Sequence, residues 1–97
     1  MAIRMTKAWS PLAADAIKKL PGQLGVFQLA DAAGEIVYIG YAGGRSLFGV
    51  RSEVERAMQE KTAGATQFRV EINMQYTTRY QELLMAHVAD HGDVPAG

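Results

Sequence analysis

The sequence predicts a single domain of mixed α/β (α+β) class, with a small, mainly antiparallel three-stranded sheet flanked by helices. The chain has 97 residues, of which 48% are hydrophobic and 21% charged, as expected for one globular domain over residues 1–97. Two short extended runs are joined by a small polar loop, and residues 68–75 alternate between apolar and polar. With the helical segments around them, the predicted order is helix, strand, strand, helix, strand, helix.

The first predicted helix covers about residues 10–20. Ser10 is a residue type that caps helices, and Pro11 suits the first helical position because its φ angle is fixed. Apolar residues follow at helical spacing, and Pro21-Gly22 ends the pattern. We therefore expect one short helix ahead of the sheet.

Two strands follow as a hairpin. The runs "GVFQLA" (25–30) and "EIVYIG" (35–40) are separated by "DAAG", in which Asp31 and Gly34 are turn formers. A loop this short makes an antiparallel pair the natural arrangement.

A glycine-rich connection, "GYAGGRSLFG", leads into a second helix that begins at about Val50. The alternating segment "FRVEINMQY" is the clearest strand of the chain. The last helix lies in "TTRYQELLMAHVADHG", with Thr77 or Thr78 as a cap and Gly92 as its end. The apolar stripe of this helix is predicted to comprise Tyr80, Leu84, His87, Val88 and His91.

Composition excludes several classes of function. The chain contains no cysteine, which rules out disulfides, thiolate metal sites and thiol catalysis and fits a cytoplasmic location. No apolar run approaches the roughly 20 residues of a membrane helix, and no secretory signal is recognisable. The formal net charge is zero, whereas an autonomous nucleic-acid-binding protein usually carries a basic excess.

The motifs "GVF" on the first strand of the hairpin and "YIG" on the second resemble the paired signature of GIY-YIG nuclease domains. The run Val37-Tyr38-Ile39-Gly40-Tyr41-Ala42 is close to the "YIGKA" of that family. The similarity extends over about residues 25–95 and includes the order hairpin, helix, strand, helix. It implies the same fold and a nucleic acid as partner.

The resemblance also implies a reaction, the hydrolysis of a phosphodiester with magnesium or manganese as cofactor. Tyr38 would be the general base, Arg45 or Arg51 would stabilise phosphate charge, and Glu82 would bind the metal. Backbone beside the motif would approach the substrate, at Gly40, Tyr41, Gly43 and Gly44.

Three positions depart from the family pattern. Phe27 replaces the tyrosine of the first motif, and the position expected for the arginine falls on Phe48 or Gly49. Glu82 lies about 160° around the last helix from its predicted apolar stripe, where Leu84 takes the place of the carboxylate. These departures favour a second hypothesis, a non-catalytic module for nucleic-acid or protein interaction on the same scaffold.

Structural alternatives exist for each candidate. Tyr38 is also explained as an ordinary strand aromatic, and the glycine-rich loop as a plain connection. Arg51 suits a surface pair with Glu55, and Arg79 a surface pair with Glu82. Two further pairs of residues each allow two interpretations. His87 and His91 are either metal ligands on one face of the last helix or partly buried, hydrogen-bonded histidines. Met5 and Trp9 either cover the sheet or form a surface for a partner.

Overall fold

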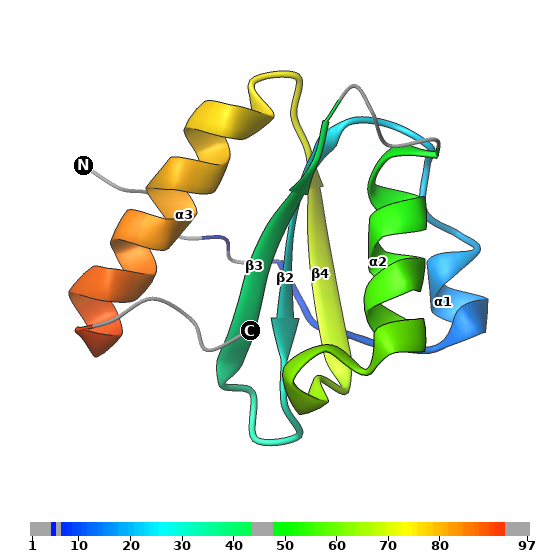
Figure 1. The fold of residues 1–97 in the computed structure, drawn as a ribbon, viewed down its shortest axis with the longest axis horizontal. Coiled ribbons are helices and arrows are strands. Elements are labelled where there is room, and N and C mark those ends of the chain that lie inside the picture. The colour runs from blue at the N-terminus through cyan, green and yellow to red at the C-terminus, as the bar shows by residue number, and fades with distance from the viewer. Residues whose placement is uncertain (1–4, 6, 44–47, 93–97) are drawn as a thin grey trace.

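A four-stranded antiparallel sheet forms the middle layer of the domain, with α1 and α2 over one face and α3 over the other (Figure 1). The computed structural model describes residue 5 and residues 7–43 and 48–92. The mixed α/β class predicted from the sequence is confirmed, and so is the antiparallel hairpin.

The strands follow the order β1-β4-β2-β3 across the sheet, so the central strand β2 pairs with both β3 and β4. In chain order the elements are β1 (Ser10–Pro11), α1 (Ala14–Ile17), β2 (Gly25–Ala30), β3 (Ile36–Ala42), α2 (Gly49–Glu60), the 3₁₀ turn η1 (Thr62–Gly64), β4 (Gln67–Ile72) and α3 (Tyr76–His91). The predicted three strands are present, and the two-residue β1 is added at one edge.

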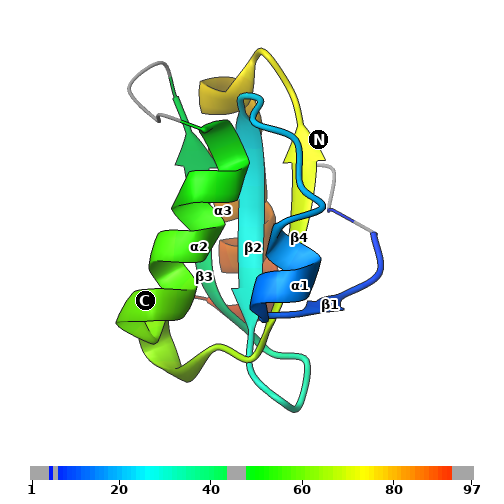
Figure 2. The same ribbon diagram turned by 90° about the vertical axis from the view of Figure 1, so that its right-hand side faces the viewer.

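The prediction for residues 10–20 was wrong at its start. Ser10 and Pro11 do not open a helix but pair with Phe68 and Gln67 on the outer edge of β4. Proline has no N–H to donate, so an edge strand is where a sheet accepts it. The helix that follows is confined to Ala14–Ile17, beside α2 (Figure 2).

The hairpin loop is built as its residue types predict. The Asp31 carboxylate accepts hydrogen bonds from the backbone N–H groups of Ala33 and Glu35, each at 3.0 Å. Gly34 has a φ of 87°, in the left-handed region that favours glycine. The turn therefore fixes the pairing of β2 with β3.

Helices α2 and α3 both begin at the same end of the sheet. Gly25 lies abreast of both Ala42, at the end of β3, and Ile72, at the end of β4. The Val50 N–H at the start of α2 donates to the Gln23 carbonyl at 2.9 Å. Residues in the first turns of both long helices therefore belong to the same end of the molecule, although the helices cover opposite faces (Figure 1).

The core has two parts, one on each face of the sheet. Side chains of α1, α2 and the adjoining face of the sheet form the first, with Ile17, Phe27, Leu29, Val54, Ala57 and Phe68 buried. The second lies under α3 and contains Met5, Val26, Ile39 and Leu83. Met5, which precedes β1, is thus one of the residues that cover the sheet.

Gly40 is explained by packing rather than by a turn. A Cβ atom at this position would lie 2.5 Å from Cζ of Phe27 and 2.8 Å from Cε2 of Tyr38, so the two rings occupy the space of a side chain. Their centroids are 5.9 Å apart. The conjunction of a tyrosine and a glycine in "YIG" therefore has a structural cause on this face of the sheet.

The buried face of α3 differs from the predicted stripe. Arg79, Leu83, Ala86 and His87 are buried, whereas Val88 and His91 are exposed. The helix begins at Tyr76 after Gln75, so Thr77 and Thr78 lie in its first turn and do not cap it. The rotation places Arg79 toward a carboxylate on β4, as described below.

We expect Gly40→Ala to lower the free energy of unfolding by about 1–3 kcal/mol, because the methyl group overlaps the Phe27 ring. Urea denaturation followed by circular dichroism measures the loss. The control is the double variant with Phe27→Leu, which removes the ring atoms that clash. Its total cost should fall below the sum of the single costs by about 1 kcal/mol; strict additivity would contradict the packing explanation.

Candidate functional site

Tyr38 lies on the face of the sheet covered by α2. It lines a small hollow of ≈ 150 Å³ between β3 and the second half of that helix. The hollow is bounded by Phe27, Tyr38, Glu53, Arg56, Ala57, Glu60 and Thr62. Two residues with hydroxyl groups, one arginine and two glutamates therefore line one depression.

Arg56 is the arginine that accompanies Tyr38. Its Nη2 donates to Oε1 of Glu53 at 2.7 Å, in an i,i+3 pair on α2. Glu53 and Glu60 are seven residues apart, or about 10 Å along a helix, so they flank the hollow from its two ends. Within the described ranges, no group of three or more acidic, histidine or cysteine residues is placed to hold a metal ion.

Neither Glu53 nor Arg56 is among the site residues predicted from the sequence. The sequence feature that could have identified this arrangement is the spacing of positions 53, 56 and 60, which lie on one flank of a helix beside its apolar stripe. That flank faces β3 only because α2 crosses the sheet with Val54 and Ala57 buried.

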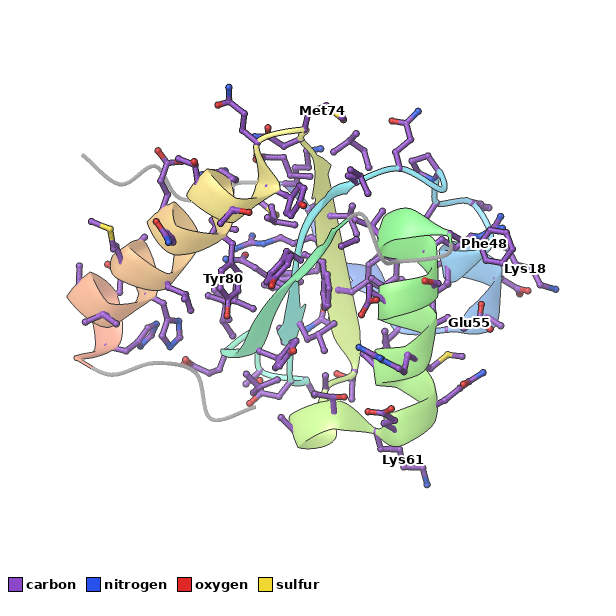
Figure 3. All side chains as sticks on the ribbon, turned by 45° about the horizontal axis from the view of Figure 1, so that its top comes forward. Lys18, Phe48, Glu55, Lys61, Met74 and Tyr80 are labelled. Carbon is purple, nitrogen blue, oxygen red and sulfur yellow. The ribbon has the colours of Figure 1, made fainter. Side chains whose placement is uncertain are left out.

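Arg51 lies in a different hollow, the groove between α1 and α2. This α1–α2 groove has a volume of ≈ 720 Å³ and is lined by Ala14, Ile17, Lys18, Phe48, Arg51, Ser52, Glu55, Arg56, Met58 and Gln59. The Arg51 guanidinium carbon lies 5.1 Å from the centroid of the Phe48 ring, a cation–π geometry. Figure 3 shows Lys18, Phe48 and Glu55 gathered at this side of the molecule.

Glu82 belongs to α3, across the sheet from Tyr38 and Arg51 (Figure 1). Nη1 of Arg79 donates to its Oε1 at 3.3 Å, and 38% of its side chain is exposed. The pairing with Arg79 expected as the alternative for this glutamate is confirmed, but Arg79 itself is buried, so only the glutamate lies at the surface. The structure thus does not bring Glu82 together with Tyr38.

Arg79 makes stronger bonds to Glu71 on β4, with Nε–Oε2 and Nη2–Oε1 distances of 2.8 and 3.1 Å. Burial alone would raise the pKa of Glu71, but hydrogen bonds from Arg79 and Asn73 outweigh burial and hold this pKa below its usual value. The pKa of Arg79 is raised, chiefly by the hydrogen bond to Glu71. This two-point pair anchors α3 to the sheet.

Two of the remaining backbone candidates, Tyr41 and Gly43, lie near α3. Tyr41, at the end of β3, is 47% exposed and contacts two aromatic rings of that helix. Its centroid is 5.6 Å from that of Tyr76 and 5.0 Å from that of Tyr80. A Cβ at Gly43 would lie 3.2 Å from the Tyr76 hydroxyl, while Gly44 and Arg45 fall outside the described residues.

Tyr80 lies in the space between α3 and β3 (Figure 3). Its pKa is raised, first by burial and then by electrostatic interaction with Tyr38 and with Tyr41. A tyrosine of this kind keeps its proton at neutral pH and serves as a hydrogen-bond donor.

His87 is buried and His91 exposed, with their ring centroids 4.4 Å apart on α3. Neither histidine belongs to a group of three or more metal-binding side chains among the described residues. Among the residues that the structure describes, every helix is too short or too polar to cross a membrane.

The fold and these hollows define a small α+β domain with candidate contact sites on both faces of its sheet. The chain belongs to the family described as a domain of unknown function (DUF7508), whose model matches residues 3–90. Neither the curated proteins nor the solved structures contain a match.

We expect Glu71→Gln to lower the free energy of unfolding at pH 7 by about 1–2 kcal/mol, because a charged two-point pair is lost. Since the pKa of Glu71 is depressed in the folded protein, its contribution is complete above the unfolded value of about 4.3 and disappears as the pH falls through the folded value. Chemical denaturation between pH 7 and pH 3 should therefore show a flatter profile for the variant.

Glu82→Gln is the matched control, because Glu82 bonds the same arginine from a more exposed position. It should cost less than about 1 kcal/mol at pH 7. An equal loss for both variants would show that β4 does not anchor the helix.

Proposed function

We propose that this domain is a protein-interaction module, built on a GIY-YIG-like scaffold and acting in the cytoplasm, that binds an acidic, partly apolar segment of a partner in the α1–α2 groove. One observation carries the proposal: Phe48, a large aromatic residue that is 50% exposed, stands at this groove with the Arg51 guanidinium against its ring. Exposed aromatic and arginine side chains of this kind are the residues that dominate binding energy at protein interfaces.

The lining of the groove supports this class of ligand. Ala14, Ile17 and Met58 provide apolar surface between the two helices, where an aliphatic or aromatic anchor is desolvated. A volume of ≈ 720 Å³ is enough for two or three side chains of a bound segment.

Charge favours an acidic segment. Lys18, Arg51 and Arg56 border the groove against the single carboxylate of Glu55, while Arg56 is already paired with Glu53. The excess of positive charge at the groove is modest and local, because the formal net charge of the whole chain is zero. Such a pattern steers a short acidic partner without the broad basic surface that nucleic acid requires.

The position of the family-derived residues also supports a binding module. Glu82 lies across the sheet from Tyr38 and is held by Arg79, so its carboxylate does not fit a metal site shared with that tyrosine. Phe27 lacks the hydroxyl of the first family motif and packs on Gly40.

Selection of a displayed library of random 12-residue peptides against the whole chain tests this proposal. We expect enriched sequences to combine an apolar anchor with Asp or Glu, and Phe48→Ala to weaken their binding by about tenfold or more. Met85→Ala is the matched control, because Met85 is a 63% exposed apolar residue on α3. Binding that is lost equally in both variants, or selection of basic peptides, would overturn the groove as the contact site.

A second candidate is phosphodiester hydrolysis, which the shared hollow of Tyr38 and Arg56 favours. A tyrosinate, formed when the Tyr38 hydroxyl loses its proton to solvent, would take a proton from the attacking water. The water oxygen would bond to phosphorus as the P–O bond to the leaving sugar oxygen breaks, and that oxygen would take a proton from solvent. The guanidinium would bind two non-bridging phosphate oxygens. No group of three or more described acidic, histidine or cysteine side chains is placed to hold magnesium or manganese, so the proposed roles rest on the tyrosine and the arginine.

Plasmid nicking distinguishes the candidates. If the hollow is catalytic, supercoiled DNA is converted to the nicked form, and Tyr38→Phe and Arg56→Gln each lower the rate by about a hundredfold. Parallel reactions with Mg²⁺, with Mn²⁺ and with a chelator establish whether a cation participates. Nicking that persists unchanged in both variants exposes a contaminating nuclease and removes this candidate.

A further inference from the structure

A third cavity lies on the opposite face of the sheet from the α1–α2 groove. It has a volume of ≈ 220 Å³ and is lined by Met5, Gln28, Ile36, Arg69, Leu83, Ala86, His87 and Asp90. Its walls come from the N-terminal segment, from β2, β3 and β4, and from α3. We call it the Arg69 cavity.

The guanidinium of Arg69 is fixed in place at this cavity. Nε donates to Oε1 of Gln28 at 2.7 Å, and Nη1 donates to the Lys7 carbonyl at 3.1 Å. The indole of Trp9 covers its face, with 4.1 Å between the guanidinium carbon and the ring centroid. These bonds use two of five N–H donors, and the other three make no hydrogen bond to any described residue.

Arg69 forms no ion pair among the residues that the structure describes, although Asp90 lines the same cavity. The ion pairs formed there by arginine involve Arg56 and Arg79, whereas both acceptors of Arg69 are neutral. Partial burial lowers the pKa of Arg69, which means that its charged form is destabilised. Partly buried charges are normally compensated by an opposite charge. An anion that enters the cavity would supply this compensation.

Gln28 adds a second fixed donor. The residue is 3% exposed, and because Nε of Arg69 can only donate, the amide oxygen of Gln28 faces the guanidinium. The amide nitrogen then faces away from Arg69, with no hydrogen bond to a described residue. Two oxygens of one anion can be bound by a guanidinium and a neighbouring amide in this arrangement.

We propose that the Arg69 cavity is a binding site for a small organic carboxylate with an apolar body. The volume corresponds to about seven water molecules at roughly 30 Å³ each, which admits an acid of four to six heavy atoms and excludes a nucleotide. Apolar side chains supply most of the remaining wall and favour a hydrocarbon tail over inorganic phosphate.

The other titratable groups around the cavity set the orientation. Asp90 and His87 come from α3, and Arg69 comes from β4. Asp90 repels a carboxylate and directs it to the guanidinium and Gln28, with the tail toward Met5, Leu83 and Ala86. This site is independent of the proposed groove, which lies beyond the other face of the sheet.

Trp9 provides the test, because it is the only tryptophan of the chain and covers Arg69. Its fluorescence is recorded for the whole protein at pH 7 during titration with sodium butyrate, with sodium chloride and butyramide as controls. We expect a saturable change with butyrate alone. No saturation with butyrate, an equal response to butyramide, or tighter binding of inorganic phosphate would overturn the proposal.

Two substitutions make the result specific. Arg69→Gln should weaken butyrate binding about tenfold to a hundredfold, while Lys61→Gln, at an exposed residue that lines none of the described cavities, leaves it unchanged. Ala86→Leu fills the cavity while retaining the guanidinium and should also abolish saturation, so the test survives if Arg69→Gln fails to fold. Butyrate binding that is unaffected by Ala86→Leu would place the anion elsewhere and refute the site.

Discussion

Complete burial of β2 is the constraint on which the rest of the structure depends. Every residue of Gly25–Ala30 is buried, so both faces of the sheet need a cover and both edges of the strand need a partner. At Gly25, a Cβ atom would lie 2.2 Å from the Glu71 carbonyl oxygen, which shows how closely β4 approaches. The helices follow from this requirement, with α2 over one face and α3 over the other.

That division also separates the candidate chemistry. Alternation along β3 sends Tyr38 toward α2 and Tyr41 toward α3, so neighbouring motif residues serve different faces. A catalytic centre on either face can use only one of the two long helices. Tyr38 therefore shares a hollow with Arg56, while Glu82 remains with Arg79 on the far side.

Local patterns were sufficient to predict the class of fold, the hairpin and the end of α3 at Gly92. These features depend on residue types acting over a few positions, such as Asp31 in its turn and the left-handed φ of 78° at Gly92. The start of the first helix could not be read in this way, because pairing of Ser10 with Phe68 involves a strand far away in sequence.

The site residues were harder to predict for the same reason. The orientation of α3 depends on the bond between Arg79 and Glu71, and no periodic pattern in the helix contains the residue on β4. Likewise, Arg69 acquires its significance from Gln28 and Trp9, and these three residues come from three separated segments of the chain. Sequence spacing identifies charged residues, but the topology decides which of them meet.

The short strand β1 has a consequence for self-association. It covers one end of the outer edge of β4, and its Pro11 cannot extend a hydrogen-bond ladder. In the described part of the chain, β3 has no strand beyond it, and its sequence "IVYIGYA" carries no charge. Pairing of two molecules through their β3 edges would form a closed pair, and Pro11 on the short β1 disfavours addition of a further strand at the opposite edge of the sheet.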